Sequence, residues 1–432
     1  MHLGKEKINN MSVELFGVIR EKREFKWGGF IILETFNGQY QCVLKNTEDC
    51  TLKNFDFSLL KPESYVRILG DEVSANVKRE LTVADKEIVV SHCEIITEPA
   101  KHPDINIYEK EVNAEPHLIF DNRALTLRNE SNKCLFKIQS VIHNSFRSTL
   151  EEMGFVSIST PKIVANGAEG GTNVFKLDYF GKDAYLAQSP QLYKQMMCGV
   201  FGKVYETAPV FRAEKHNTSR HLNEYISLDA EMVIKKSFYE LIEIEKIILD
   251  YIFGNILQKA GAELKYLGVE YKSFTDNPHN AFVAKVSDIK EILGSTGEDM
   301  SSDEEKEIAR YALEKHNTNF IFATHYNREV RPFYTKLSPD GITTESFDCI
   351  YKGIEITSGG QRKEGLQEYV DAIVASGMNQ EPFEPYLDTF RYGMPLHGGF
   401  AIGLERLTAK ICNIESVKSA TLFPRDVDRL IP

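Results

Sequence analysis

Short segments of alternating hydrophobic and polar residues fill the first part of the chain. Five such segments, rich in β-branched and aromatic residues, lie between residues 11 and 97, and turn signals such as Asn37-Gly38 separate some of them. They read VELFGVIRE, GFIILET, QYQCVLK, YVRILGD and EIVVSHCEII. Five strands in this span predict a small barrel with the OB-fold as the favoured form, and a β-sandwich is the alternative.

The hydrophobic period changes after this region. Residues 96–117 contain three prolines and no sustained apolar period, which indicates a linker. Apolar residues then recur in steps of three and four, which predicts an amphipathic helix that ends at Gly154. These residues are Leu135, Ile138, Ile142, Phe146, Leu150 and Met153. A second long helix is expected at 237–261, and two helices around a polar loop at 284–315.

These patterns predict an α+β chain with three parts. Residues 1–97 form a five-stranded OB-fold barrel, 98–119 a hinge, and 120–432 a larger domain with a surface insertion at about 262–320. The chain has 432 residues and a net charge of -12, which argues against a general nucleic-acid coat but not against an enzyme with local basic patches.

Cysteine spacing and hydropathy indicate the compartment in which the chain is expected. Seven scattered cysteines without a CxxC pair favour reduced thiols in a cytoplasm over disulfides or a zinc site. The N-terminus lacks the apolar core of a signal peptide, and no apolar run of about 18 residues predicts a membrane span.

A dense polar block, FRAEKHNTSRHLNEY at 211–225, lies between two segments that alternate like antiparallel strands. Arg212 and Glu214 share one face of the first strand, and Tyr225, Asp229 and Glu231 share one face of the second. A solvated face with surface salt bridges would explain this block equally well if it stood alone.

Three further segments could complete a site. In QSPQLYKQ (188–195), Ser189, Gln191 and Lys194 could hold an amino acid, although Ser189 could equally cap a helix that begins at Pro190. In FDCIYKGIEITSGGQR (347–362), Asp348 and Glu355 could hold Mg²⁺, although simple solvent exposure is the commoner explanation. HGGFAIGLERL (397–407) is neither a Walker A loop nor a GxGxxG turn, and a tight structural turn would also explain it.

Together these motifs resemble those of class II aminoacyl-tRNA synthetases. Thr160-Pro161, the polar block and GGFAIGLER follow in the family's order, and the chain from about residue 12 is similar to aspartyl-tRNA synthetases of the archaeal and eukaryotic type. The resemblance implies an anticodon-reading OB-fold, a catalytic antiparallel sheet flanked by helices, and a homodimer. Much of the dimer interface would come from the helix at 133–153 and the strand that ends at Pro161.

The resemblance also implies roles for individual residues. Arg212 and Arg406 would be catalytic and would bind the ATP phosphates and adenine. Further ATP contacts would come from Glu214, Arg220, His221, Tyr225 and Glu355, with Mg²⁺ held by Asp348 and Glu355. L-Aspartate would be bound by Glu169, Ser189, Gln191, Lys194, Asp229, Ser358 and Arg362. Phe30 and Gln41 would contact the anticodon of tRNA(Asp).

Lys194 and Arg362 indicate the substrate, because a neutral amide would leave one or both buried cations unpaired. The barrel departs from the family pattern, since Glu34-Thr35 replaces a usual Arg-Asp pair. That change costs tRNA affinity unless Lys22, Arg23 or Lys26 compensates.

Three functions remain open at this point. The first is an aspartate–tRNA ligase that charges tRNA(Asp) alone or tRNA(Asn) as well. The second is a tRNA-independent enzyme that adenylates aspartate for another acceptor such as ammonia. The third is a non-catalytic tRNA-binding protein, against which the complete set of ATP-site residues argues.

Overall fold

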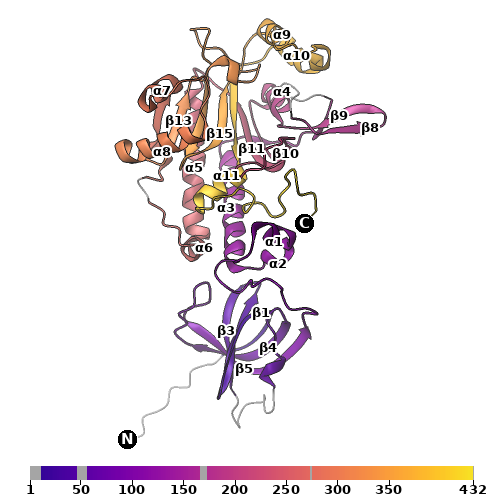
Figure 1. The fold of residues 1–432 in the computed structure, drawn as a ribbon, viewed down its shortest axis with the longest axis vertical. Coiled ribbons are helices and arrows are strands. Elements are labelled where there is room, and N and C mark those ends of the chain that lie inside the picture. The colour runs from indigo at the N-terminus through magenta and orange to yellow at the C-terminus, as the bar shows by residue number, and fades with distance from the viewer. Residues whose placement is uncertain (1–10, 46–55, 166–172, 273–274, 432) are drawn as a thin grey trace. The chain divides into compact units, whose positions relative to one another are not determined.

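The computed structural model describes residues 11–45, 56–165, 173–272 and 275–431. The chain forms two compact units, residues 1–132 and 133–432, and each has its own hydrophobic core. Figure 1 shows the first unit in indigo and purple, and the second from purple through magenta and orange to yellow. Within the described residues, no helix is both long enough and apolar enough to cross a membrane.

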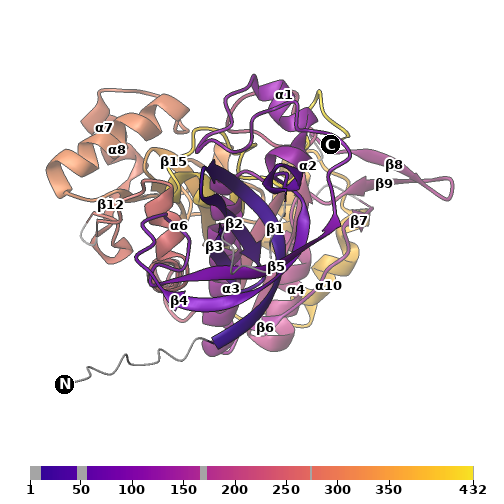
Figure 2. The ribbon, with the colours of Figure 1, turned by 90° about the horizontal axis from the view of Figure 1, so that it is seen from below.

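The first unit is a closed five-stranded barrel with the strand order β1-β2-β3-β5-β4 (Figure 2). Its strands are β1 (Met11–Phe25), β2 (Gly28–Thr35), β3 (Gly38–Lys45), β4 (Tyr65–Ser74) and β5 (Lys86–Thr97). Ile19, Leu33 and Ile68 are fully buried inside it, as the alternating sequence requires. Closure of the sheet confirms the predicted OB-fold barrel and excludes the sandwich.

The segment that follows the barrel belongs to the same compact unit. It contains α1 (Pro116–Asp121) and α2 (Arg123–Thr126). The Asn129 side-chain amide donates to the carbonyl oxygens of Ile107 and Glu109, at 3.0 and 2.7 Å. Ile107 is buried, so this segment has fixed contacts despite its prolines and charges.

The second unit is built on an eight-stranded sheet of order β12-β13-β14-β15-β16-β11-β10-β6. Neighbouring strands are antiparallel except for the outermost pairs, β12–β13 and β10–β6, which are parallel. The strands are β6 (Val156–Ser157), β10 (Lys203–Phe211), β11 (Glu224–Val233), β12 (Phe282–Lys285), β13 (Phe320–Thr324), β14 (Ser346–Tyr351), β15 (Ile354–Gln361) and β16 (His397–Gly403). A smaller sheet contains β7 (Ile163–Val164), β8 (Lys176–Tyr179) and β9 (Lys182–Leu186).

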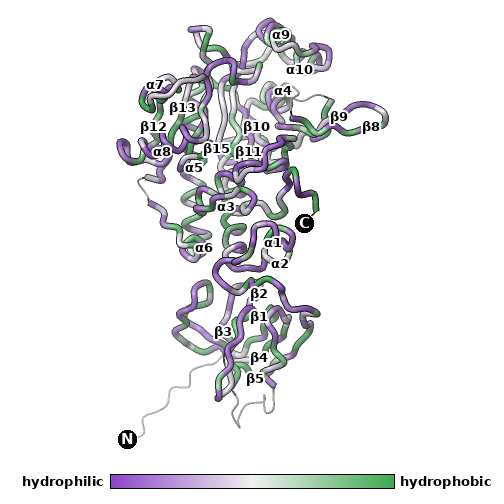
Figure 3. The backbone as a smooth tube through the Cα atoms, in the orientation of Figure 1, coloured by the Kyte–Doolittle hydropathy of each residue, from purple (hydrophilic) through white to green (hydrophobic). Residues whose placement is uncertain are grey.

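Two long helices pack on one face of the large sheet. The predicted helices are present as α3 (Glu130–Glu152) and α5 (Tyr239–Lys259), and their apolar stripes share a core with Phe347 and Phe400 of the sheet. Figure 3 shows hydrophobic and hydrophilic residues alternating along the strands of both units. The other helices are α4 (Gln191–Phe201), α6 (Gly261–Tyr266), α7 (Val286–Leu293), α8 (Ser302–His316), α9 (Leu366–Ala375), α10 (Glu384–Arg391) and α11 (Leu404–Ile411).

Side chains alternate across β14, so this strand contributes both to the core and to a cavity. Phe347 and Cys349 belong to the core shared with α3 and α5, whereas Asp348 between them lines the cavity. The six described cysteines are buried, whereas Cys50 lies outside the described residues.

Candidate active site

A cavity of about 430 Å³ in the second unit contains almost every side chain that the motifs predicted. Its polar lining comes from the loop between β10 and β11, from β11, β14 and β15, and from the starts of α4 and α11. The predicted residues that line it are Ser189, Gln191, Lys194, Arg212, Glu214, Arg220, His221, Tyr225, Asp229, Asp348, Glu355, Ser358, Arg362 and Arg406. Glu169 lies outside the described residues.

The polar block forms one wall of this cavity, and Tyr225 lies on β11 as predicted. Arg212 and Glu214 were predicted on the first strand, but β10 ends at Phe211 and both residues lie in the loop that follows it. The side-chain amide of Asn223 donates to the carbonyl oxygens of Arg212 and Glu214, at 2.7 and 3.0 Å, and so holds the start of the connecting loop. Arg212 Nη1 lies 3.9 Å from Glu214 Oε1.

His221 returns from the loop to the same wall. Its Nε2 lies 3.6 Å from Glu214 Oε2. Partial burial lowers the pKa of His221 below its ordinary value, and the nearby carboxylate of Glu214 opposes this shift. The imidazole is therefore mainly neutral at pH 7.

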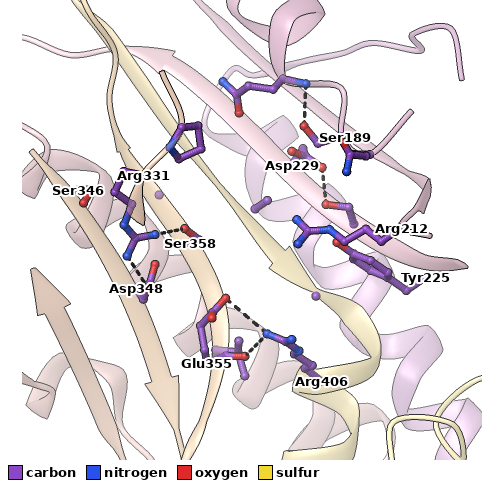
Figure 4. A pocket seen from close by; sticks show the side chains of 18 of the residues that line it. Ser189, Arg212, Tyr225, Asp229, Arg331, Ser346, Asp348, Glu355, Ser358 and Arg406 are labelled. Atoms are coloured by element: carbon purple, nitrogen blue, oxygen red, sulfur yellow. Dashed lines mark hydrogen bonds and ion pairs between the residues drawn. The ribbon is translucent and has the colours of Figure 1, made fainter. Parts of the chain in front are cut away.

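Arg406 enters the cavity from the first turn of α11 (Figure 4). Its Nη1 donates to the Glu355 carbonyl oxygen at 3.0 Å and lies 3.4 Å from Glu355 Oε1. The preceding residue serves the fold, because the carboxylate of Glu405 accepts hydrogen bonds from the Ile226 amide at 3.1 and 3.2 Å. Burial raises the pKa of Glu405 to about 7.

The two predicted metal ligands, Asp348 and Glu355, lie on neighbouring strands, and Asp348 pairs with a cation that the sequence did not reveal. Arg331 Nη2 donates to Asp348 Oδ2 at 2.6 Å, and Nη1 donates to Ser358 Oγ at 2.9 Å. Burial and the charge of Asp348 raise the pKa of Glu355 to about 7. Among the described residues, no three His, Cys, Asp or Glu side chains are grouped as a metal site.

A buried cluster of four charged residues, Lys194, Asp229, Glu231 and Arg362, contributes all but Glu231 to the cavity wall. Lys194 Nζ lies 2.9 Å from Asp229 Oδ1 and 3.5 Å from Glu231 Oε2. Arg362 forms a two-pronged pair with Glu231, at 2.8 and 3.0 Å. Although burial alone would raise the pKa of Glu231, the charges of Arg362 and Lys194 hold it below its ordinary value.

This cluster corrects one premise of the sequence prediction. Lys194 and Arg362 were expected to lack counter-charges until a substrate carboxylate arrives, and that premise is wrong because Asp229 and Glu231 already pair with them. Sequence reasoning placed Glu231 on the correct face of β11 but gave it no role. The glycine at 399 is explained by the same residue, since a Cβ there would lie 2.2 Å from Glu231 Oε2.

The start of α4 differs slightly from the predicted cap. The helix begins at Gln191, with Pro190 rather than Ser189 in the cap position. The Ser189 hydroxyl nevertheless accepts a hydrogen bond from the Gln191 amide at 3.1 Å. Gln191 Oε1 in turn accepts a hydrogen bond from Arg362 Nη2 at 3.4 Å, which connects this helix start to the charge cluster.

Comparison with known proteins identifies the family of this chain. The family described as tRNA synthetases class II (D, K and N) matches residues 115–427. The chain belongs to this family. It is also 41% identical over 434 residues to the aspartate–tRNA(Asp/Asn) ligase of Thermus thermophilus, a match that covers 100% of this chain and 98% of the relative.

Other relatives extend the same similarity. The aspartate–tRNA(Asp) ligase of Pyrococcus abyssi is 41% identical over 353 residues, which is 80% of each chain. An asparaginyl-tRNA synthetase from Pyrococcus horikoshii, complexed with asparaginyl-adenylate, superposes with a TM-score of 0.88 at 26% identity and covers 98% of this chain and 97% of its own. An aspartyl-tRNA synthetase from Entamoeba histolytica gives 0.83 at 29% identity, covering 98% and 90%.

The insertion of this synthetase contributes to the site, although its sequence suggested a surface element. Glu305 of α8 forms an ion pair with Arg220 and accepts a hydrogen bond from the Glu355 amide at 3.0 Å. Glu305 and Arg220 are 85 positions apart in the chain, and no local pattern indicates their contact.

The barrel of the synthetase presents the two predicted anticodon contacts on neighbouring strands. Phe30 lies on β2 with the Arg23 guanidinium 5.8 Å from its ring centre, and Gln41 on β3 donates to Glu87 Oε2 at 2.9 Å. The acidic replacement Glu34 forms an ion pair with Arg20. Arg20 is therefore one counter-charge of Glu34, and compensation of the tRNA affinity by Lys22, Arg23 or Lys26 stays a prediction.

Proposed function

We propose that this class II synthetase is an aspartate–tRNA ligase, which activates L-aspartate with ATP and transfers it to the 3′ end of tRNA(Asp). One observation carries the proposal: Lys194, Asp229 and Arg362 of the buried charge cluster line the same cavity as Arg212 and Arg406, and Glu231 pairs with Arg362 behind them. The cavity thus combines a wall suited to phosphate groups with paired charges suited to a charged amino acid. The names of the relatives that match across the chain agree with this substrate.

Charge balance explains the preference for aspartate over asparagine. With aspartate bound, the positive groups are Lys194, Arg362, Arg212 and the substrate ammonium. The negative groups are Asp229, Glu231 and the two substrate carboxylates. Asparagine lacks one of these negative charges, so one buried cation would lose its balance, at a cost of several kcal/mol. This account keeps the predicted substrate contacts but no longer requires unpaired cations in the free enzyme.

The chemistry follows from these positions. The α-carboxylate of aspartate attacks the α-phosphorus of ATP in line, and pyrophosphate leaves with the electrons of the broken P–O bond. Arg212 neutralises the charge that develops on the α-phosphate, and Arg406 holds the adenine and the γ-phosphate. A terminal ribose hydroxyl of the tRNA then attacks the mixed anhydride, and AMP leaves. Positioning and charge neutralisation supply most of the acceleration.

Asp348 and Glu355 would hold Mg²⁺ in this scheme. Their fit to a hard cation is supported by Asp348 Oδ1, which is buried without a hydrogen-bond partner, and by the oxygen-rich lining at Glu355 and Ser358. When bound, the ion supplies charge neutralisation on the phosphate oxygens.

We extend the proposal to three properties of the whole protein. Charging of tRNA(Asn) as a second substrate is supported by relatives named aspartate–tRNA(Asp/Asn) ligase that match nearly the whole chain. A cytoplasmic location is supported by the scattered, buried cysteines. A homodimer with α3 and the segment up to Pro161 in its interface is supported by the exposed Val156 on edge strand β6.

Amino-acid-dependent exchange of pyrophosphate into ATP tests the first step. We expect exchange with aspartate and at least about 100-fold less with asparagine at equal concentration. Faster exchange with asparagine would contradict the substrate assignment. Formation of asparagine from aspartate, ATP and ammonia without tRNA would favour the adenylating enzyme that lacks a tRNA substrate.

A further inference from the structure

Arg331 is a buried cation of the cavity with no role in the scheme above. It follows the short 3₁₀ turn Arg328–Val330 in the loop between β13 and β14. Its side chain is 10% exposed, and its guanidinium lies 3.7 Å from the ring centre of Tyr326. Stacking on this ring fixes the plane of the guanidinium and therefore the directions of its N–H groups.

The guanidinium connects two strands at the predicted cation site. It donates to Asp348 on β14 and to Ser358 on β15, and Figure 4 shows both contacts. Asp348 and Ser358 face each other in the strand register, so one planar group holds both side chains. Asp348 Oδ2 is thereby occupied, while Oδ1 is left without a hydrogen-bond partner.

The local charges are balanced before any ligand enters. The carboxylates of Asp348 and Glu355 face two guanidinium groups, those of Arg331 and Arg406. A guanidinium is not deprotonated in proteins, so the Arg331 cation is permanent. A free divalent ion would therefore meet a wall without net negative charge, and only a bound triphosphate would supply the missing anionic oxygens.

We propose that Arg331 is a positioning residue, which holds Asp348 and Ser358 in their binding orientation and supplies the positive charge there until nucleotide arrives. As a result, the divalent cation binds together with ATP rather than before it. The inference rests on the proposed function only in taking this cavity as the ATP site.

Titration with Mn²⁺ alone, followed by the loss of the free-ion electron paramagnetic resonance signal, tests the inference without any catalysis. Arg331→Gln removes the charge and frees Asp348 Oδ2, so we expect it to bind Mn²⁺ at least about tenfold more tightly than the unaltered chain. Arg331→Met does the same with a side chain that still packs on Tyr326, in case the glutamine variant fails to fold. Unchanged Mn²⁺ affinity in the folded variants would overturn the proposal.

Two further variants test whether the gain in Mn²⁺ affinity arises at Asp348. Arg328→Gln is the matched control, because Arg328 is an exposed arginine three residues earlier that pairs with Glu329 and does not line the cavity. It should leave Mn²⁺ binding unchanged. Adding Asp348→Asn to Arg331→Gln should abolish the gain in affinity, and a gain that persists would place the new ion elsewhere and contradict the assignment.

Arg331→Lys separates charge from geometry. Lysine keeps the cation but cannot donate to Asp348 and Ser358 from one plane, so free Mn²⁺ binding should stay within about threefold of the unaltered chain. The KM for MgATP in pyrophosphate exchange should rise more than kcat falls. A gain in Mn²⁺ affinity equal to that of the glutamine variant would refute the charge argument. Aspartate-dependent pyrophosphate exchange by the unaltered chain tests the proposed function separately.

Discussion

At the scale of single residues, Arg212 is the side chain on which the proposed chemistry depends most. It lies just beyond the end of β10, lines the cavity, and is 38% exposed, so it contributes little to the core. We expect Arg212→Ala to reduce aspartate-dependent pyrophosphate exchange at least about 100-fold, because the charge on the α-phosphate loses its partner. The thermal unfolding midpoint should remain within a few degrees of that of the unaltered chain.

Arg391→Ala is the control for this experiment. Arg391 is equally exposed and also ion-paired, but it lies on α10 and does not line the cavity. Both variants should unfold at similar temperatures, and only the first should lose exchange. Near-normal exchange by Arg212→Ala would refute the role assigned to this residue.

Substitution of Lys194 tests whether this side chain gives the site its preference for aspartate over asparagine. Lys194→Gln leaves Asp229 and Glu231 with only Arg362, so we expect the KM for aspartate to rise at least about 100-fold and the unfolding midpoint to fall. The double variant Lys194→Gln with Asp229→Asn restores the charge balance. It should recover much of the stability but not the preference for aspartate over asparagine in the exchange assay. Recovery of that preference would show that Lys194 does not select the substrate.

The residue scale also shows where sequence reasoning succeeds and where it stops. Tyr225 and Asp229 could be assigned to one wall, because strand alternation decides the face of each residue on β11, whereas Arg212 and Glu214 reach the cavity from the loop after β10. Arg331 and Glu305 could not be found, since each acts through a contact with a distant segment and neither belongs to a motif. The pairing of both substrate-side cations was missed for the same reason.

At the scale of elements, helix α5 buries a carboxyl group against the sheet. Glu245 is fully buried behind β14 and β15, near Cys349 and Thr357. Burial raises its pKa from 4.5 to about 8, and the charge of Asp348 adds to the shift. The folded chain therefore holds a proton that the unfolded chain releases above its ordinary pKa. Stability should fall as the pH rises from about 4.5 to about 8 and then level off.

Glu245→Gln tests this expectation because glutamine is neutral at every pH and has nearly the same shape. The difference between the unfolding midpoints, variant minus unaltered chain, should increase between pH 5 and pH 8. The increase should correspond to a few kcal/mol in the free energy of unfolding. Glu243→Gln on the same helix is the control, since that side chain is 64% exposed. Parallel pH profiles for Glu245→Gln and the unaltered chain would contradict the assignment of a buried proton.

The barrel allows a direct test of tRNA binding. Trp27 is the only tryptophan in the chain, is 48% exposed, and stacks on Phe25, whose ring centre lies 5.9 Å from that of Phe30. We expect tRNA(Asp) to change the Trp27 fluorescence, and Phe30→Leu to weaken the tRNA affinity at least about fivefold. A tRNA for another amino acid serves as the control at the same ionic strength. Equal responses to both tRNAs would argue against anticodon reading by this surface.

Elements were predicted best where their period is strong. The barrel strands and the helices α3 and α5 show clear alternation or clear steps of three and four, and the structure has them at those places. The insertion was harder to interpret, because its helices were visible in sequence but their docking on the sheet was not. The parallel pairing of β12 and β13 depends on a tertiary contact that the alternation of either strand leaves open.

At the scale of the whole molecule, both compact units are expected to serve one reaction. The catalytic unit supplies the adenylate, and the barrel supplies selection of the tRNA, so removal of the barrel should spare the first step and impair the second. We expect a chain reduced to residues 110–432 that still folds to retain pyrophosphate exchange and to lose most of its tRNA charging. Equal loss of pyrophosphate exchange and tRNA charging in a folded truncation would show that the barrel is needed for both steps.

Aminoacylation with labelled aspartate tests the central claim most directly, using the full chain, ATP and Mg²⁺ with purified tRNA(Asp) and tRNA(Asn) in separate reactions. The account predicts acid-precipitable aspartate on tRNA(Asp), with tRNA(Asn) charged as well if the proposed wider specificity holds. Absence of label on both tRNAs, in a preparation that still exchanges pyrophosphate with aspartate, would contradict it.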